Sequence, residues 1–536
     1  MGIPSYFSYI IKNYSNIIKN LQYFKNNNVN FNSLYMDCNS IIYDSVHMLE
    51  KSINLGELEL PKDFESLIIL TVIEKIKTYI DFVKPSNILF IAFDGVAPFA
   101  KMEQQRTRRY KSLFISKNSF DNKNKKSSWN TASITPGTQF MDKLSKSIKK
   151  EFQKKEKKFN LKKIIISGSD ERGEGEHKMY NHIRNNISNE KILIYGLDAD
   201  LIMLSILHLK YSENIYVFRE TPEYFKNLIS LETAPNEPHF LDIEKLSHSI
   251  MSEMNCKYST KNRIIDYVFI CFFLGNDFLP HFPAMNIRTH GITALLDIYR
   301  NCIGNFENRY FISPDNGKLE WNNIGLFIKQ IAKGERHFLL SEYSVRNKFN
   351  HYTFKETTIE EKENVLLNAP VIYRSDENYI YPQEPFWEER YYKCLFGIEP
   401  KYNIIEKICI NYFEGLEWVY NYYTGDCIDW KWKYNYFYPP LFGNLCKFIP
   451  KNNDILLKQK GESSMSPYTQ LCYVLPKSYH NLLPSNIEKY VNENYKDCYP
   501  GSYEFKWAFC RYFWEAHPIL PEIPIYEIEM KIEKLK

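Results

Sequence analysis

The sequence lacks the features that mark secreted, membrane-spanning and zinc-binding proteins. Its 11 cysteines are an odd set without one C-x-x-C pair, and no His/Cys cluster has zinc-ligand spacing, so we expect scattered reduced thiols. The N-terminus, MGIPSYFSYI, shows no basic segment followed by an apolar one, as a signal peptide would. The most apolar run, residues 267–275, is far shorter than the roughly 20 residues of a membrane span. We therefore expect a soluble intracellular protein without a membrane partner, cytoplasmic rather than nuclear.

The chain also has little net charge. Its 68 basic and 64 acidic residues give a formal net charge of +4, which does not by itself indicate a nucleic-acid-binding protein, so any basic surface must be local. The composition is that of a globular protein, and 536 residues leave room for two or three domain-sized units. The abundance of Asn, Lys and Ile indicates an AT-rich coding sequence.

The first 300 residues alternate between apolar strands and amphipathic helices. The predicted strands are LYMD (34–37), NILFIAFDG (87–95), KKIIISG (162–168), the start of KILIYGLDAD (191–200) and NIYVFRE (214–220). Helices are predicted over residues 62–83 and over residues 264–277, where the second is buried and ends at Asp277. Strands joined by helical crossovers favour an α/β fold with a mainly parallel central sheet and flanking helices.

Acidic residues follow four of these strands, and a seventh acid ends the buried helix. They are Asp37, Asp94, Glu174, Glu176, Asp198, Asp200 and Asp277. In parallel sheets, ligands bind at the carboxyl ends of the strands. The alternative is that an aspartate caps the helix that begins near Leu201. That alternative explains one of Asp198 and Asp200 but not both, and it does not explain the repetition after four strands.

Seven carboxylates at one sheet edge would repel one another and raise several pKa values. Divalent cations relieve this repulsion, and magnesium prefers such hard oxygen ligands. Two magnesium ions about 4 Å apart can activate a water and stabilise a leaving oxygen in phosphodiester cleavage. The acids therefore predict a site for two Mg²⁺ ions.

The segment KMEQQRTRRY predicts a helix with a phosphate-binding face. Lys101, Gln105, Arg108 and Arg109 have the spacing i, i+4, i+7 and i+8, which places them on one side of a helix. Three cations and an amide can hold a phosphate, arginine through its planar fork. A solvated basic face is the alternative, as it is for the ten lysines between residues 143 and 163. The position of KMEQQRTRRY directly after an acid-bearing strand favours the functional interpretation.

Many segments resemble the XRN family of 5′→3′ exoribonucleases, which share their acidic core with flap endonucleases. In the first 300 residues the matching segments are MGIPSYF, LYMDCNSIIY, IAFDGVAPFAKMEQQRTRRY, ITPGTQFMDKL, GEGEHK, GLDADLIML and LGNDFLPHFP. Later ones are WVYNYYTGDCIDWKWKYNYFYPP, PYTQLCYVLP and WEAHPILPEI, with poor matching at 221–262 and 303–385.

The resemblance implies a PIN/flap-nuclease-like core that removes nucleoside 5′-monophosphates from single-stranded RNA with a 5′-monophosphate end. It implies a nuclease core at 1–300, a variable connecting region at 301–385, and a mostly helical C-terminal block at 386–536 that completes the active-site pocket. The seven acids fall on the family's metal-binding acids, with Mg²⁺ expected and Mn²⁺ as a substitute. The four residues on one face of the helix predicted for KMEQQRTRRY (Lys101, Gln105, Arg108 and Arg109) fall on the family's pocket for the 5′-monophosphate. A triphosphate or a cap would not fit in that pocket.

The resemblance also implies aromatic side chains that stack on the terminal base. Tyr43 stands where the family usually has a histidine, and it still offers a ring for stacking. Trp418, Trp430 and Trp432 match family tryptophans, one of which stacks opposite that position, and we favour Trp430. Two further departures are Phe99 and Glu103, where arginine and asparagine are usual.

Two other functions use the same acids. A flap-type DNA nuclease usually has a glycine-rich helical hairpin after the last acid, whereas GNDFLPHFPAMNIRTHG stands here. A catalytically silent protein that binds RNA 5′ ends need not keep all seven acids. Both alternatives are therefore less favoured than the exoribonuclease.

Overall fold

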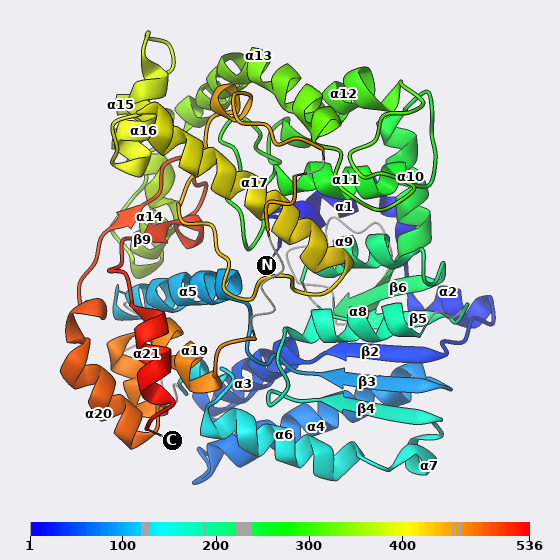
Figure 1. The fold of residues 1–536 in the computed structure, drawn as a ribbon. Coiled ribbons are helices and arrows are strands. Elements are labelled where there is room, and N and C mark those ends of the chain that lie inside the picture. Colours follow the sequence, from blue (N-terminus) through cyan, green and yellow to red (C-terminus); the bar gives the residue numbers. More distant parts are fainter. Residues whose placement is uncertain are drawn as a thin grey trace.

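The structure is a computed structural model that describes residues 2–118, 129–186, 189–196, 198–220, 238–452, 454–457 and 463–535. It confirms the predicted α/β fold, with a mostly parallel central sheet, flanking helices and a helical C-terminal region (Figure 1). The strands of the sheet are β1 (Ile18–Lys19), β2 (Ser33–Asp37), β3 (Ile88–Ala92), β4 (Lys163–Ser167), β5 (Ile192–Tyr195), β6 (Ile215–Glu220) and β7 (Pro238–Asp242).

Within the described residues, the α-helices of the first 300 positions lie before, between and after these strands. They are α1 (Tyr6–Asn13), α2 (Leu21–Asn26), α3 (Asn39–Asn54), α4 (Phe64–Val83), α5 (Phe99–Asn118), α6 (Gln139–Phe152), α7 (Glu156–Phe159), α8 (Gly175–Asn185), α9 (Asp200–His208), α10 (Ile243–Met254), α11 (Arg263–Phe272) and α12 (Gly291–Tyr299). Those that follow are α13 (Trp321–Asn347), α14 (Ile359–Ile372), α15 (Ser375–Ile380), α16 (Trp387–Phe396), α17 (Tyr402–Thr424), α18 (Phe442–Leu445), α19 (Pro467–Val474), α20 (Ser485–Asn494) and α21 (Ile525–Ile532), with the short strands β8 (Phe505–Lys506) and β9 (His517–Pro518).

The strand order of the sheet creates a switch point next to β2. The order is β1-β7-β6-β5-β2-β3-β4, and the five strands from β6 to β4 are parallel, with β7 antiparallel at one side. The chain builds β3 and β4 on one side of β2 and then crosses to build β5 and β6 on the other. A crevice forms outside the carboxyl ends of the strands at such a reversal. The predicted acids follow the strands at this edge.

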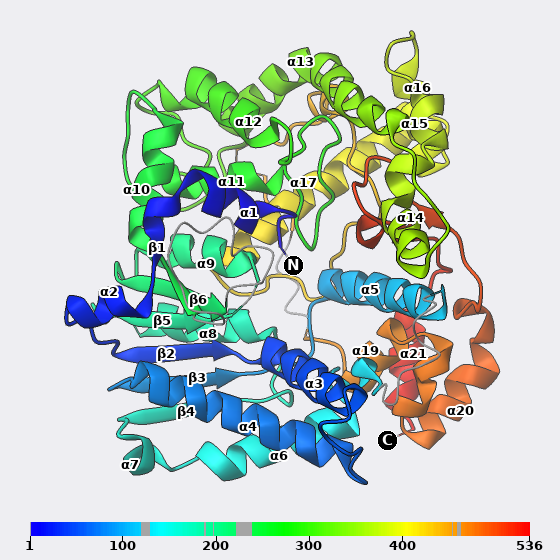
Figure 2. The ribbon, with the colours of Figure 1, turned by 180° about the vertical axis from the view of Figure 1, so that it is seen from behind.

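Strand alternation sends β2 side chains into two hydrophobic clusters. Leu34 and Met36 pack with α3, α4 and α6 on one face, whereas Tyr35 belongs to a larger cluster that includes α8, α9 and α11. Figures 1 and 2 show these opposite faces from the two sides. The larger cluster continues into α12, α13 and α15 to α18, so most of the helical region and one face of the sheet share one core.

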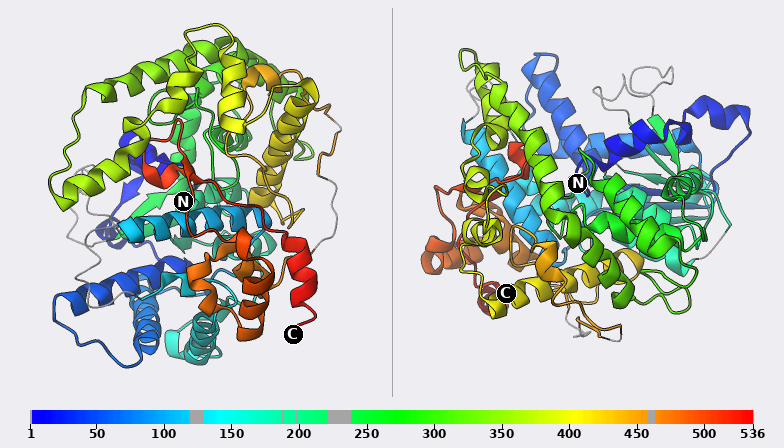
Figure 3. Two further views of the ribbon diagram at one scale, coloured as in Figure 1. Left: turned by 90° about the vertical axis from the view of Figure 1, so that its left-hand side faces the viewer. Right: turned by 90° about the horizontal axis from the view of Figure 1, so that it is seen from above.

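Helix α5 lies between the helical region and the C-terminal segment, as the side view in Figure 3 shows. Its buried residues Phe99 and Met102 belong to a third cluster, with α19, α20 and α21. No helix among the described residues has both the length and the apolar character needed to cross a membrane. The proposed boundaries at residues 300 and 385 stay a prediction.

The predicted end of the buried helix at Asp277 is wrong. Helix α11 ends at Phe272, because the chain then turns through Gly275, whose φ of 84° lies in the left-handed region. A Cβ on Gly275 would lie 2.6 Å from the backbone nitrogen of His281, so the turn also requires the absence of a side chain. This turn places Asp277 in a loop.

Candidate functional site

The sheet edge brings the acids that follow β2, β3 and β4 together. Asp37 is the last residue of β2, and Asp94 lies two residues beyond the end of β3. Glu174 and Glu176 flank the first residue of α8. The backbone N–H of Gly175 donates to Oδ1 of Asp94 at 2.7 Å, and a Cβ on Gly175 would lie 2.8 Å from Oδ1 of Asp37. Glycine at this position therefore allows the start of α8 to approach both aspartates closely.

Lys101 joins Asp277 to this group from the first turn of α5. Its ammonium lies 2.6 Å from Oε2 of Glu174 and 2.7 Å from Oδ2 of Asp277. Oδ1 of Asp277 accepts from the backbone N–H of Gly2 at 3.1 Å, and Oε1 of Glu174 accepts from the Tyr422 hydroxyl at 2.9 Å. Although burial opposes both changes, these ion pairs raise the pKa of Lys101 and lower the pKa of Asp277. The lysine is therefore fixed among acids, and whether it also binds a phosphate stays a prediction.

Three other carboxylates of the cluster have unsatisfied oxygens. Oδ1 of Asp37, Oε2 of Glu176 and Oδ1 of Asp200 are buried without a hydrogen-bond partner in the described part of the chain. Burial, followed by repulsion from neighbouring acids, raises the pKa of Asp37 and of Glu176 well above their usual values and that of Asp200 to about 7. Uncompensated buried carboxylates cost several kcal/mol. The donor set therefore fits a divalent cation, which would satisfy these oxygens and keep them ionised.

The structure also answers whether Asp198 or Asp200 caps a helix. Helix α9 begins at Asp200, its N-cap residue is Ala199, and no side-chain hydrogen bond caps it. Asp200 is buried and Asp198 is exposed. The capping alternative is therefore not supported for either aspartate.

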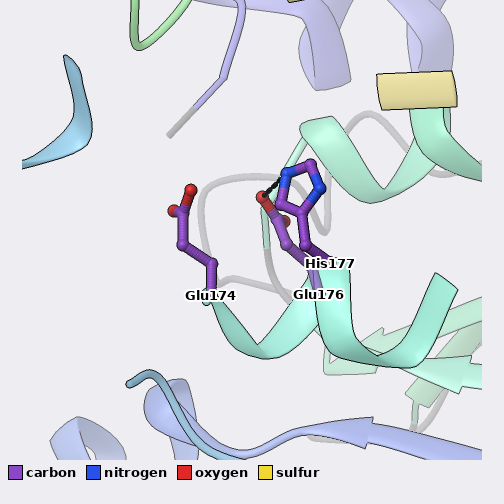
Figure 4. A group of neighbouring side chains, drawn as sticks. All are labelled: Glu174, Glu176 and His177. Carbon is purple, nitrogen blue, oxygen red and sulfur yellow. Dashed lines mark ion pairs between the residues drawn. The ribbon is translucent and has the colours of Figure 1, made fainter. Parts of the chain in front are cut away.

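His177 is a member of the site that the sequence did not predict. Candidate ligand atoms of Glu174, Glu176 and His177 all lie within 4.8 Å of one another (Figure 4). The His177 ring stacks on Tyr422 with centroids 3.6 Å apart, and burial together with Lys101 lowers its pKa well below the usual value. The imidazole is therefore neutral at pH 7. Its place beside Glu176 in GEGEHK was the only available signal, because Tyr422 comes from a distant helix.

The other three residues predicted to bind phosphate have different surroundings along α5. Arg108 is exposed. Gln105 accepts from the side chain of Gln470 at 3.2 Å, and Arg109 donates to the hydroxyl of Thr135. Gln470 and Thr135 thus position the side chains of Gln105 and Arg109, whereas Arg108 is open to solvent. Their role in binding a phosphate stays a prediction.

The three candidate tryptophans differ in burial. Trp418 and Trp432 are 0% and 7% exposed and stack on each other with centroids 5.3 Å apart, so they are core residues. Trp430 is only half-buried, and the Arg172 guanidinium lies 5.2 Å from its ring centroid. Tyr43, on α3, is also half-buried. Among the predicted stacking residues, Tyr43 and Trp430 therefore retain exposed surface.

Phe99 and Glu103, the two residues of α5 that depart from the family's usual pattern, attach this helix to the C-terminal region. Glu103 accepts from Lys433 at 2.8 Å and from the Tyr473 hydroxyl. Burial would raise the pKa of Glu103, but Lys433 and Tyr473 lower it below its usual value. Phe99 packs on the same tyrosine ring with centroids 4.9 Å apart. Both residues have structural partners and lie off the predicted phosphate-binding face.

Comparisons with known proteins match nearly the whole chain. The family model of the XRN 5′-3′ exonuclease N-terminus matches residues 1–221, and that of the Xrn1 helical domain matches residues 257–381 and 374–535. The chain is 25% identical to the 5′-3′ exoribonuclease 2 homolog of Drosophila melanogaster over 86% of this chain and 62% of that protein. It is 26% identical to 5′-3′ exoribonuclease 2 of Arabidopsis thaliana, over 84% and 58%. The chain thus spans about three fifths of the length of these relatives.

Proposed function

This chain belongs to the XRN family of 5′→3′ exonucleases, and from that premise we propose that it degrades 5′-monophosphorylated single-stranded RNA from the 5′ end. Each cycle hydrolyses the first phosphodiester bond, releases a nucleoside 5′-monophosphate and leaves a new 5′-phosphate on the shortened RNA. The names of the similar proteins support this activity. The observation that carries it is the set of buried, unsatisfied carboxylate oxygens at the switch point of the sheet.

These acids are the proposed ligands of Mg²⁺, with Mn²⁺ as a substitute. Asp37, Glu176 and Asp200 offer the unsatisfied oxygens, and the other four acids, Asp94, Glu174, Asp198 and Asp277, complete the proposed set for two ions. The bound cations would supply Lewis-acid activation of water and of the scissile phosphate. Lys101 offsets part of the negative charge of the cluster, through Glu174 and Asp277.

The side chains around the acids would select the end of the substrate. Arg108 presents an exposed guanidinium on the helix that carries Lys101, and a guanidinium binds a phosphate through paired N–H donors. Tyr43 and Trp430 offer partly exposed rings, and stacking on rings favours unpaired nucleotides without strong base preference. Together they support recognition of a single-stranded 5′-monophosphate end.

The proposed function is tested by a time course on 3′-labelled single-stranded RNA with Mg²⁺. Matched RNAs carry a 5′-monophosphate, a 5′-triphosphate or a 5′-hydroxyl, and single-stranded DNA serves as a control substrate. We expect loss of the monophosphate RNA without long intermediates and little loss of the triphosphate RNA. Cutting at internal junctions or at DNA flaps would indicate a flap-type nuclease. Tight binding of 5′-monophosphate ends by folded protein without cleavage would indicate a scaffold.

A further inference from the structure

A second face of α5 borders a cavity of about 860 Å³. None of the four predicted phosphate-binding residues lines it. The α5 residues that do are Ala100, Glu103, Gln104, Thr107 and Lys111. Its other walls come from the N-terminal segment, the loop around Asp277, the segment 433–438 and the C-terminal segment around 508–517. This volume is in the range of roughly 300–1,000 Å³ that is typical of small-molecule sites.

The cavity reaches the acidic cluster through its N-terminal wall. Gly2 and Asp277 both line the cavity, and they are hydrogen-bonded to each other at 3.1 Å. A Cβ on Gly2 would collide with Oδ1 of Asp200. The N-terminal segment at Gly2 therefore contacts the acidic cluster and also lines the cavity.

The cavity wall holds buried polar atoms that the described residues leave without partners. Both amide atoms of Gln104, Nδ2 of Asn276 and the hydroxyl of Tyr438 are buried without a hydrogen-bond partner among the described residues. Such atoms are uncommon in folded proteins, and several around one cavity indicate a polar occupant. An amide that can donate and accept at once suits the edge of a nucleobase.

The charges of the wall nearly cancel. Lys433 pairs with Glu103 at 2.8 Å, and Arg288 pairs with Glu515 at 2.5 Å. Of the lysines and arginines that line the cavity, Lys111 forms no ion pair with a carboxylate among the described residues. Burial lowers the pKa of Lys111 to about 8, so the side chain is mostly protonated at pH 7. One such cation can attract one phosphate, whereas a path for an RNA strand needs repeated phosphate contacts.

Aromatic side chains complete the cavity wall. Tyr512 and Trp514 stack with centroids 4.2 Å apart, and Trp514 is 46% exposed. Both residues line the cavity. A planar base can stack on an exposed indole of this kind.

We propose that this cavity receives the nucleoside 5′-monophosphate that hydrolysis releases at the acids, as an exit site on a different side of α5 from the predicted phosphate-binding residues. The inference rests on the proposed function. The released nucleotide carries the 5′-phosphate that the predicted phosphate-binding face held, so it must leave that face before the new 5′ end of the RNA can enter it, and the cavity offers it a place to go. Gln104 and the Tyr512–Trp514 pair would hold the base, and Lys111 would attract the phosphate. The nearly balanced charges of the wall keep this binding weak, as release of a product requires.

Photolabelling with 8-azidoadenosine 5′-monophosphate tests the site without any cleavage. We expect label in the peptides that contain residues 507–517, with protection by excess AMP or UMP. Gln104→Leu, which keeps the size of the side chain, should lower this label at least five-fold. Gln105→Leu is the matched control, because it changes the neighbouring glutamine on the other face, and it should retain the label in these peptides. Equal loss in both variants, or no label in 507–517, would refute the exit site.

A kinetic comparison distinguishes an exit site from part of the RNA path. Thr107→Trp fills the cavity from α5. We expect single-turnover removal of the first nucleotide to stay within two-fold of wild type, while steady-state turnover on long RNA falls at least five-fold. If both rates fall equally, the cavity holds RNA, and if neither changes, it holds no product, so either result refutes the proposal. A wild-type protein that degrades no RNA would instead refute the proposed function, whatever the photolabelling shows.

Discussion

In the helical region, Glu377 is 1% exposed and is thus buried as deeply as Glu174, Glu176 and Asp200 at the sheet edge. Its two oxygens accept hydrogen bonds from Arg346 at 2.5 and 2.8 Å and from Arg374 at 2.6 Å. The backbone N–H of Phe509 donates a further bond at 2.9 Å. At the sheet edge, by contrast, the neighbours of Glu176 include other carboxylates, and one of its oxygens has no partner among the described residues.

The two regions show that burial alone does not distinguish an acid that the protein compensates from a candidate metal ligand. The protein itself compensates Glu377, whereas the sheet edge gathers acids that its own donors do not fully satisfy. A structural acid therefore stabilises the fold as it stands. An acid that waits for an external cation carries a cost in stability that the cation would offset, and such strain is typical of active sites.

The largest expected effect comes from Asp200→Asn. It removes one charge from the cluster with little change in shape, so we expect RNA cleavage to fall by on the order of 10³-fold or more. Without metal, the free energy of unfolding at pH 8 should stay equal or rise, because one repelling charge is gone. Cleavage rates and urea unfolding measure the two effects.

Magnesium provides the control for this variant. It should raise the melting temperature of the wild type, since a ligand of the folded state stabilises it, and it should have a smaller effect on Asp200→Asn. Normal magnesium-dependent activity in the variant would exclude Asp200 from the site. A clear loss of stability would place it with Glu377 among the structural acids.

Glu377→Ala should show the opposite behaviour. It leaves Arg346 and Arg374 buried without their carboxylate, so we expect a loss of about 3–5 kcal/mol in the free energy of unfolding. Cleavage per folded molecule should stay near the wild-type value. Urea unfolding, with active molecules counted by titration, tests both statements, and a loss below about 1 kcal/mol would contradict the comparison.

The gathering of acids at the sheet edge was predictable from sequence, because local pattern determines it. Apolar runs that end in acids predicted the strands, and the repetition of acids predicted the cluster. The end of α11 was missed, since it depends on a close approach between Gly275 and His281 that only the folded chain creates. Lys101 was predicted to bind phosphate, but its nearest partners are Glu174 and Asp277, which come from other elements.

Long-range partners were beyond the sequence for the same reason. His177 gains its place in the site by stacking on Tyr422, and no local periodicity relates two residues of different helices. The compensation of Glu377 by two arginines is likewise a product of packing. Sequence patterns therefore predicted which residue types gather at the sheet edge, but not which of them the protein compensates.

Glu335 sharpens the comparison as an intermediate case. Its oxygens accept from the backbone N–H groups of Phe442 and Gly443 at 2.7 and 2.9 Å. Burial nevertheless raises its pKa from 4.5 to about 7. The folded protein thus keeps the proton up to about pH 7, whereas the unfolded chain releases it near pH 4.5. The stability that this group contributes is present below pH 4.5 and is lost as the pH rises through 7.

The expected result is a flatter pH profile in Glu335→Gln. Between pH 5 and pH 8, wild type should lose roughly 1–3 kcal/mol more of its free energy of unfolding than the variant. Urea unfolding at several pH values measures this difference. Parallel profiles would show that the two N–H donors compensate the ionised carboxylate fully, as the arginines do for Glu377.

The smallest expected effect concerns the cations of α5, where one basic side chain is compensated by the protein and another is not. Lys101 is buried between two acids, whereas Arg108 is exposed. Arg108→Ala should leave the fold unchanged and reduce the preference for a 5′-monophosphate over a 5′-hydroxyl by about 10-fold, or about 1.4 kcal/mol, because one charge-assisted contact is lost. The measurement is the ratio of kcat/KM for the two RNAs.

Ser112→Ala, an exposed change one turn further along α5, serves as the control and should keep the wild-type ratio. An unchanged ratio in Arg108→Ala would remove Arg108 from the proposed end-binding pocket and leave its charge as part of a solvated helix face.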